Sequence, residues 1–224
     1  MHFSILDFDR VEQNILTSLV DFSYCKTVVD GGASDGLFTF PILEKMGPEG
    51  ILHAIEPDAS SASVLLQRQS QHPFGKNIVY YPETLGSEDS LTTRKLDTLI
   101  PGFVDLLKLD IEGHEYNALC GAQKICLQPQ LLLWMECHLC FFERSGQMDR
   151  ARTMLLNLLN HHFFLYHVNF RKDAFFSERF MPLESQHVDK FIHEFNLPDR
   201  PTWIFGAKGY DRELLENFFT KGEF

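Results

Sequence analysis

The segment from Val28 to Gly36 constrains the fold of this 224-residue chain more than any other. It reads Val-Val-Asp-Gly-Gly-Ala-Ser-Asp-Gly, an apolar run that ends on a carboxylate and breaks into a glycine-rich turn. Glycines let a backbone turn sharply and approach a ligand that a Cβ would keep away. Such a turn after an apolar strand is typical of the first strand and loop of a nucleotide-binding α/β domain.

The acid that precedes the glycines indicates the kind of ligand. A dinucleotide places its pyrophosphate against such a turn, where the carboxylate of Asp30 would repel it. S-adenosylmethionine carries a sulfonium and an ammonium group and no phosphate, so the same carboxylate favours it. The loop therefore predicts a methyl-donor site rather than a nicotinamide site, with these contact residues: Asp30, Gly31, Gly32, Ala33, Ser34 and Gly36.

A second acid supports the same site. The apolar segment Ile51–Ile55 reads as the next strand and ends at Glu56 and Pro57. Glu56 follows Asp30 at close to the spacing of ~20 residues at which nucleotide-binding folds carry an acid that accepts hydrogen bonds from a ribose. We assign Glu56 and Pro57 to the cofactor site. The alternative is that both acids are ordinary solvated residues at strand ends.

Composition indicates one enzyme-sized domain over residues 1–224, because a hydrophobic content of 44% can form a full core. The stretch 169–200 is longer than a simple crossover and predicts a lid, an interface or a packed surface excursion. No apolar run approaches the ~20 residues of a membrane span, and the first residues lack the pattern of a secretory signal. We therefore expect a cytoplasmic protein, whose oligomeric state the sequence does not indicate.

Net charge and cysteine content indicate which ligands and partners the chain is expected to bind. The formal net charge is −11, which argues against a nucleic-acid partner because phosphate binding needs clustered Lys and Arg. The five cysteines are odd in number and unevenly spaced, as expected of reduced thiols. Cys137 and Cys140 form a C-x-x-C pair, but a structural zinc site needs a second pair of similar spacing. Buried, hydrophobic thiols are the expected alternative.

The remaining chain alternates between strand and helix patterns. Together with the two strands above, five further segments predict an α/β fold with a seven-stranded, mostly parallel sheet flanked by helices. These segments are 77–81, 104–110, 131–136, 163–168 and 202–207. Helical patterns occur at 39–46, 60–69, 115–119, 149–160 and 212–219. In such folds ligands bind beyond the carboxyl ends of the strands.

Five ionisable side chains lie in the run from Lys108 to Glu115, directly after an apolar strand. This run, Lys-Leu-Asp-Ile-Glu-Gly-His-Glu, is preceded by Leu96-Asp-Thr-Leu99 and followed by Glu136-x-His138. In these residues the chain resembles the FkbM family of S-adenosylmethionine-dependent methyltransferases, over roughly residues 27–138 and more weakly to Tyr166. The segment between Gly86 and Leu91 departs from the family, because it is shorter than the family's hairpin-like stretch.

The resemblance implies a class I, Rossmann-like methyltransferase fold and O-methylation of a sugar, polysaccharide or natural-product hydroxyl. It implies that the glycine loop and Glu56 bind the methyl donor. It also carries over the family signature, which contains Lys108, Asp110, Glu112, Gly113 and Glu115, and it places Asp110 beside the cofactor.

Methyl transfer to an alcohol needs a group that accepts the hydroxyl proton as attack proceeds. The sequence offers four candidates for this base near the strand ends: Glu112, His114, Glu136 and His138. An imidazole matches neutral pH better than an ordinary carboxylate. We favour His138 as the base, with Asp110 and Glu136 shaping the acceptor site. Each histidine has the alternative of an ordinary core or surface role.

Asp110 and Glu136 follow consecutive strands and suggest a second arrangement. Two carboxylates at neighbouring strand ends suit Mg²⁺, which would bind the acceptor oxygens and lower their pKa, as in catechol-type O-methyltransferases. The alternative is that these acids only cap helices or bind acceptor hydroxyls. Two other functions stay open at this point, an NAD-dependent oxidoreductase and a non-catalytic cofactor-binding scaffold.

Overall fold

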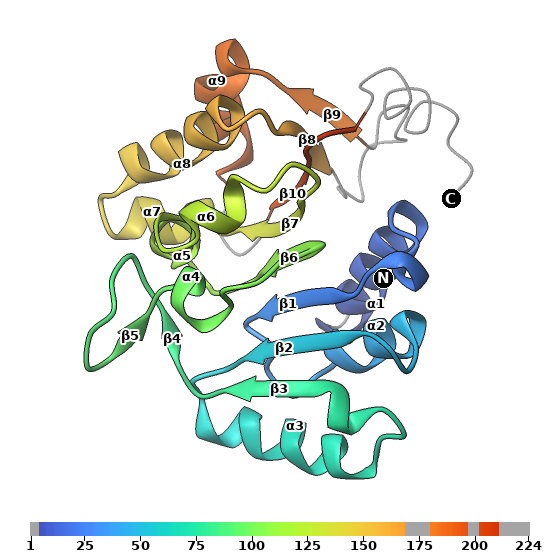
Figure 1. Ribbon diagram of the computed structural model, residues 1–224. Coiled ribbons are helices and arrows are strands. Elements are labelled where there is room, and N and C mark those ends of the chain that lie inside the picture. Colours follow the sequence, from blue (N-terminus) through green and yellow to red (C-terminus); the bar gives the residue numbers. More distant parts are fainter. Residues whose placement is uncertain (1–4, 169–179, 197–201, 211–224) are drawn as a thin grey trace. The chain divides into compact units, whose positions relative to one another are not determined.

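The computed structural model describes residues 5–168, 180–196 and 202–210 (Figure 1). The chain divides into two compact units. The first contains the residues up to Thr84 together with Val104–Lys108, and the second contains Leu85–Phe103 and the residues from Leu109 on.

The first unit has strands that pair in parallel. β1 (Thr27–Gly31) pairs with β2 (Ile51–Ile55), and β2 pairs with β3 (Ile78–Tyr81). β6 (Leu106–Leu109) is the neighbour of β1 on its other side. The helices of this unit are α1 (Ile5–Leu19), η1 (Phe22–Tyr24), α2 (Thr39–Met46), α3 (Ala59–Gln71) and η2 (Gly75–Asn77).

Local sequence explains where the elements of the first unit begin and end. Pro41 is tolerated in α2 because it lies in the first turn, and α2 ends at Gly47, which adopts φ +74°. The carboxylate of Asp58 caps α3 by accepting a hydrogen bond of 2.8 Å from the N–H of Ser61. Val28, Val29 and Leu52 are fully buried. This apolar packing fixes the strand ends from which the glycine-rich loop departs.

The second unit has strands in the order β7-β10-β8-β9, and every neighbouring pair is antiparallel. Its strands are β5 (Thr93–Arg94), β7 (Leu132–Cys137), β8 (Phe164–Val168), β9 (Phe180–Leu183) and β10 (Thr202–Ala207). β4 (Thr84–Leu85) lies where the first unit ends and the second begins. It forms a separate two-stranded sheet with β5, and residues 86–92 connect the two strands. The helices are α4 (Leu96–Leu99), α5 (Glu115–Cys120), α6 (Gln123–Cys126), α7 (Leu139–Arg144), α8 (Met148–Asn160), η3 (Ser185–His187) and α9 (Val188–Phe195).

The core of the second unit lies around β7 and β10. Every residue of β10 is buried, and so is every residue of β7 except Glu136. Strands that are apolar on both faces need cover on both faces. α8 supplies part of this cover, since it packs against β8 and against α5, α7 and α9. Glu136 is therefore a polar exception at the carboxyl end of a buried strand.

All seven strands that the sequence predicts are present. Parallel pairing holds in the first unit, whereas β10 enters between β7 and β8 antiparallel to both. The helix expected at 212–219 lies outside the described residues. α1, α7 and α9 were not expected from the sequence. No helix in the described part of the chain is both long enough and apolar enough to span a membrane.

The predicted insertion at 169–200 is partly described. Its residues 180–196 form β9, η3 and α9, and β9 extends the sheet beside β8. Residues 169–179 and 197–200 lie outside the described residues. The role of this stretch as a lid or interface stays a prediction.

Candidate active site

The glycine-rich loop after β1 is tied to the end of β2 by its own backbone. The N–H groups of Gly32 and Ala33 both donate to the carbonyl of Ile55, at 3.0 and 3.1 Å. Three residues adopt positive φ: Gly32 (80°), Ser34 (48°) and Gly36 (86°). A Cβ on Gly36 would lie 2.4 Å from the ring of Phe40, so glycine is required there by the protein's own packing.

The amide groups of this loop are largely satisfied within the protein. Besides Gly32 and Ala33, the N–H of Ser34 donates to Glu56, that of Gly36 to Ala33, and that of Leu37 to Asp35. A loop that binds phosphate offers free N–H groups at a helix N-terminus. The loop here suits a ligand without phosphate better, in agreement with the ligand expected from the sequence.

Asp30 and Lys108 form a buried ion pair beneath the loop. Asp30 Oδ1 lies 3.1 Å from Lys108 Nζ, and Asp30 Oδ2 accepts a hydrogen bond of 2.7 Å from the hydroxyl of Thr39. Asp30 is fully buried, and Lys108 is 3% exposed. The Lys108 ammonium also donates to the carbonyl of Gly32 at 3.4 Å and lies 4.9 Å from the ring centroid of Phe38.

This pair changes the interpretation of Asp30. The sequence predicts a carboxylate that faces the ligand, whereas the structure places Asp30 between Lys108 and Thr39, without exposed surface. We now expect Asp30 to act through Lys108 on the shape of the loop. Lys108 has no cofactor role in the sequence prediction, but a lysine inside the apolar strand Leu-Leu-Lys-Leu is a signal for a buried partner.

Glu56 is held in place at the end of β2. It is 8% exposed; its Oε2 accepts from the N–H of Ser34 at 2.9 Å and its Oε1 from the N–H of Asp58 at 2.7 Å. Each carboxylate oxygen can accept more than one hydrogen bond, so this arrangement leaves acceptor capacity for a ligand hydroxyl. Pro57 follows on the surface.

In the second unit, Asp110, Glu136 and His138 come together. Asp110 follows β6 directly, Glu136 lies near the end of β7, and His138 follows β7. One ligand atom of each side chain lies within 4.8 Å of those of the other two. The sequence groups these three residues by their places at strand ends, and the structure confirms that they are neighbours. We call them the acid–histidine cluster.

His138 lies between two carboxylates. Its Nδ1 is 3.7 Å from Glu115 Oε1, and its Nε2 is 3.8 Å from Glu136 Oε1. Both distances suit ion pairs and are too long for hydrogen bonds. Burial lowers the pKa of His138, but the carboxylates of Glu115, Asp110 and Glu112 together raise it by more, so its pKa lies above the ordinary histidine value.

Glu112 and His114 lie apart from the cluster. Both side chains are exposed, and neither belongs to the group of ligand atoms around His138. Glu112 occupies a turn with φ +52°, and His114 precedes the first residue of α5 without capping that helix through its side chain. The sequence favours His138 among the four candidates for the base, and the structure brings His138 and Glu136 together while Glu112 and His114 stay exposed.

The C-x-x-C pair is buried. Cys137 and Cys140 are free thiols, and burial raises the pKa of Cys137 well above its usual range. Among the described residues, the one grouping suited to a metal contains neither cysteine. These features are in keeping with a packing role for the pair.

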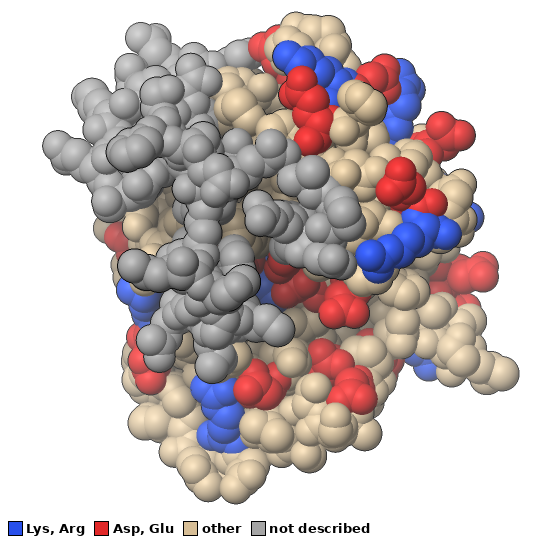
Figure 2. All heavy atoms as spheres, turned by 180° about the vertical axis from the view of Figure 1, so that it is seen from behind, with Lys and Arg blue, Asp and Glu red and all other residues tan. Residues whose placement is uncertain are grey.

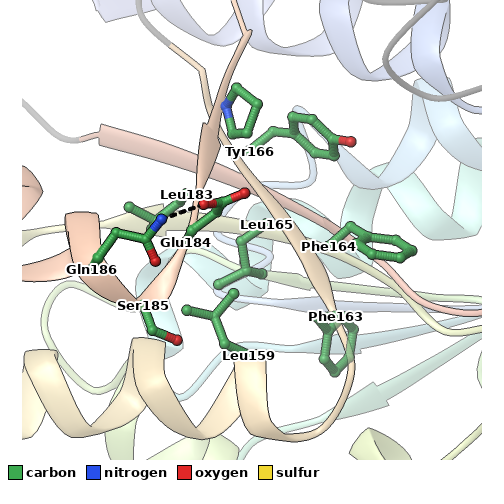
Figure 3. Close-up of a pocket in the computed structure, with 10 residues that line it drawn as sticks. Leu159, Phe163, Phe164, Leu165, Tyr166, Leu183, Glu184, Ser185 and Gln186 are labelled. Atoms are coloured by element: carbon green, nitrogen blue, oxygen red, sulfur yellow. Dashed lines mark hydrogen bonds between the residues drawn. The ribbon is translucent and has the colours of Figure 1, made fainter. Parts of the chain in front are cut away.

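A cavity of about 260 Å³ lies elsewhere in the second unit (Figure 3). Leu159, Phe163 and Leu183 contribute apolar walls, and Glu184 accepts a hydrogen bond from Gln186 at its edge. In the sheet, Phe164 of β8 and Leu132 of β7 both pair with Ala207 of β10. At the other end of these strands, Glu136 of β7 and Val168 of β8 both pair with Trp203 of β10. The cavity is therefore at the end of these strands opposite to the acid–histidine cluster.

Comparisons with known proteins identify the family and the fold of the chain. The methyltransferase FkbM domain matches residues 67–196, which is more than half of the chain. This match begins after Glu56 and extends further toward the C-terminus than the resemblance in the sequence. No curated protein matches the sequence at a significant level.

Solved structures of low sequence identity share the fold. The methyltransferase FkbM from Methylobacillus flagellatus KT is 19% identical with a TM-score of 0.54, over 81% of this chain and only 43% of its own. The O-methyltransferase TomG from Streptomyces achromogenes, solved with SAM, is 10% identical with a TM-score of 0.57, over 93% of this chain and 82% of its own.

The O-methyltransferase from Bacillus cereus, solved with SAH, is 11% identical with a TM-score of 0.59, over 92% of this chain and 82% of its own. These likenesses show an α/β Rossmann-like fold of the class I methyltransferases. Together with the family match, which includes the whole run from Lys108 to Glu115, they identify the chain as a member of the FkbM family of S-adenosylmethionine-dependent methyltransferases.

Proposed function

We propose that this methyltransferase transfers a methyl group to a hydroxyl group of a sugar, polysaccharide or natural-product acceptor. The observation that carries the proposal is the acid–histidine cluster, in which two carboxylates and an imidazole lie within 4.8 Å of one another. Such groups accept hydrogen bonds from hydroxyls, and one of them can take the proton that the hydroxyl loses. Family membership displaces the alternative of an NAD-dependent oxidoreductase.

The first unit supplies a site that fits S-adenosylmethionine. Gly31 to Gly36 form the loop, and Glu56 is oriented to accept from the ribose hydroxyls. The Asp30–Lys108 pair holds the carbonyl of Gly32, and with it the shape of the loop. When bound, the cofactor supplies an electrophilic methyl group. TomG and the Bacillus cereus enzyme, which bind SAM and SAH, support this assignment.

His138 is our candidate for the base. Its raised pKa makes it a stronger proton acceptor than an ordinary histidine once the pH exceeds that pKa. Asp110 and Glu136 lie close enough to orient the acceptor and to stabilise the imidazolium that forms. Asp110 also stays our candidate for a cofactor contact.

A divalent cation is the second route to the same chemistry. Asp110, Glu136 and His138 offer two carboxylates and an imidazole, which suit Mn²⁺ or Zn²⁺ as well as the Mg²⁺ expected from the two acids. A cation held there would lower the pKa of the acceptor hydroxyl. Exhaustive chelation tests this route: turnover is lost if the cation is needed and unchanged if His138 acts alone.

The charge of the cluster indicates the class of acceptor. Glu112 and Glu115 add to its negative charge, because both act on the pKa of His138. A phosphorylated acceptor would be repelled, so we expect a neutral, hydroxyl-rich one. On the face in Figure 2, the coloured Lys and Arg side chains form small groups among acidic ones, which fits a small molecule better than a nucleic acid.

The direct test is methyl transfer from isotopically labelled S-adenosylmethionine. The acceptor panel pairs neutral glycosides and phenols with their phosphorylated counterparts, each with Mg²⁺, with Mn²⁺ and with chelator. We expect labelled methyl ethers from neutral acceptors and little product from phosphorylated ones. Cofactor binding without product across the panel would contradict the proposal and would favour a non-catalytic scaffold.

A further inference from the structure

Glu115 is a buried acid that belongs to neither the cofactor site nor the acid–histidine cluster. It is the first residue of α5, its side chain is fully buried, and among the described residues its Oε2 has no hydrogen-bond partner. Burial of a carboxylate is costly unless other groups compensate it. The groups that surround Glu115 therefore show what it does.

The first group that contacts Glu115 is the backbone of the loop before α5. Glu115 Oε1 accepts from the N–H of Gly113 at 3.1 Å and from that of Ile111 at 3.4 Å. The backbone there has positive φ angles, +52° at Glu112, which is unfavourable for a residue with a side chain, and +94° at Gly113, which suits glycine. On its other side, a Cβ on Gly113 would lie 2.7 Å from the Cβ of Phe141 in α7. Glu115 thus fixes a loop that begins directly after Asp110.

The imidazole of His138 is the other surrounding group. Its Nδ1 is buried, has no hydrogen-bond partner among the described residues and lies 3.7 Å from the same Glu115 Oε1. Its ring is in contact with Phe141, with centroids 5.4 Å apart. Nε2 lies on the other side, 3.8 Å from Glu136 Oε1, but the side chain of Glu136 is 13% exposed whereas that of Glu115 is fully buried. A carboxylate beside one ring nitrogen favours the tautomer that carries its proton there, and the more deeply buried carboxylate does so more strongly because less water screens its charge.

We infer that Glu115 is a positioning residue that keeps the proton of neutral His138 on Nδ1 and leaves the lone pair on Nε2. Because Glu115 is fully buried, it acts through His138 and the 111–113 loop rather than on the acceptor itself. The same orientation serves either route, since Nε2 can accept a proton or bind a cation. This inference rests on the proposed function of the acid–histidine cluster.

The test compares Glu115→Gln with the wild type. Glutamine keeps a carbonyl acceptor for the two backbone N–H groups but removes the charge beside Nδ1. We expect kcat to fall by roughly 10²-fold while the KM for S-adenosylmethionine and the melting temperature stay close to wild type. Glu143→Gln, which changes an exposed acid on α7, is the matched control and should change none of these values.

A second readout needs no turnover. In ¹⁵N NMR spectra recorded above the His138 pKa, the wild type should show a protonated Nδ1 and an unprotonated Nε2. Glu115→Gln should shift both nitrogens toward a mixture of tautomers. Wild-type tautomer populations in this variant would overturn the inference, as would an unchanged kcat. Absence of turnover in the wild type with the expected NMR change would instead contradict the proposed function alone.

Discussion

The two candidate sites of this protein differ in the balance of positive and negative charge among their side chains. Around the cofactor loop, Asp30 is paired with Lys108, and the loop amides donate to other groups of the protein. In and beside the acid–histidine cluster, carboxylates outnumber the imidazole of His138. We expect the first arrangement to hold the shape of a loop and the second to leave groups available for chemistry. Each variant below changes one site and leaves the other intact.

The largest effect is expected on removal of the base. His138→Ala should lower kcat by roughly 10²–10⁴-fold, because the acceptor loses the group that takes its proton. The affinity for S-adenosylmethionine, measured by calorimetry, should stay unchanged. His193→Ala, in an exposed histidine of α9, is the control. A near-normal kcat for His138→Ala would assign the base elsewhere in the cluster.

Breaking the buried pair should have the largest effect on stability. Lys108→Met leaves the charge of Asp30 buried without its partner and should reduce the free energy of unfolding by about 3–5 kcal/mol. Urea denaturation measures this loss, and Lys45→Met on the surface of α2 serves as the control. Adding Asp30→Leu should recover much of the stability. Failure of the double variant to recover any would mean that the pair does more than balance charge.

Glu56→Ala should weaken cofactor binding by a smaller amount. Loss of a charged acceptor for hydrogen bonds costs ~1.5–3 kcal/mol, or roughly 10- to 100-fold in Kd. Calorimetric titration with S-adenosylmethionine gives this value, with Glu49→Ala at an exposed position as the control. An unchanged Kd would remove Glu56 from the cofactor site.

The pH dependence is the mildest of the expected effects. His138 accepts a proton only when it is neutral, so kcat should rise as the pH rises through its pKa. Because neighbouring carboxylates raise that pKa, the rising limb should lie above the ordinary histidine value near 6.5. The measurement is a pH profile of kcat at saturating cofactor. A rising limb of the kcat profile below pH 6.5, or a profile without a rising limb, would argue against an imidazole base.

Local patterns made the strand, the glycine-rich turn and the helix around Asp30 predictable from the sequence. The glycines, the preceding apolar strand and the helix at Thr39–Met46 depend on neighbours in the chain, and the structure has that helix with the predicted bounds. The pairing of Lys108 with Asp30 joins distant residues that only the order of strands brings together. The sequence therefore predicts an Asp30 that faces the ligand, whereas the structure buries it against Lys108 and Thr39.

The residues around the acid–histidine cluster were also only partly predictable, although they are close to one another in the chain. Asp110, Glu136 and His138 could be grouped because each follows or ends a predicted strand. Glu112, His114 and Glu115 are close neighbours in the chain, but the positive φ of Glu112 and Gly113 decides which side chain turns inward. No residue pattern specifies that choice, so the burial of Glu115 emerged only from the structure.

One paired measurement tests the division of roles between the two sites. Kd for S-adenosylmethionine and kcat for the best neutral acceptor are determined side by side for Glu56→Ala and His138→Ala. We predict that Glu56→Ala raises Kd and, at saturating cofactor, keeps kcat near wild type. We predict the reverse for His138→Ala, with Kd unchanged and kcat sharply reduced. Equal losses of affinity and rate in both variants would contradict separate binding and reaction sites.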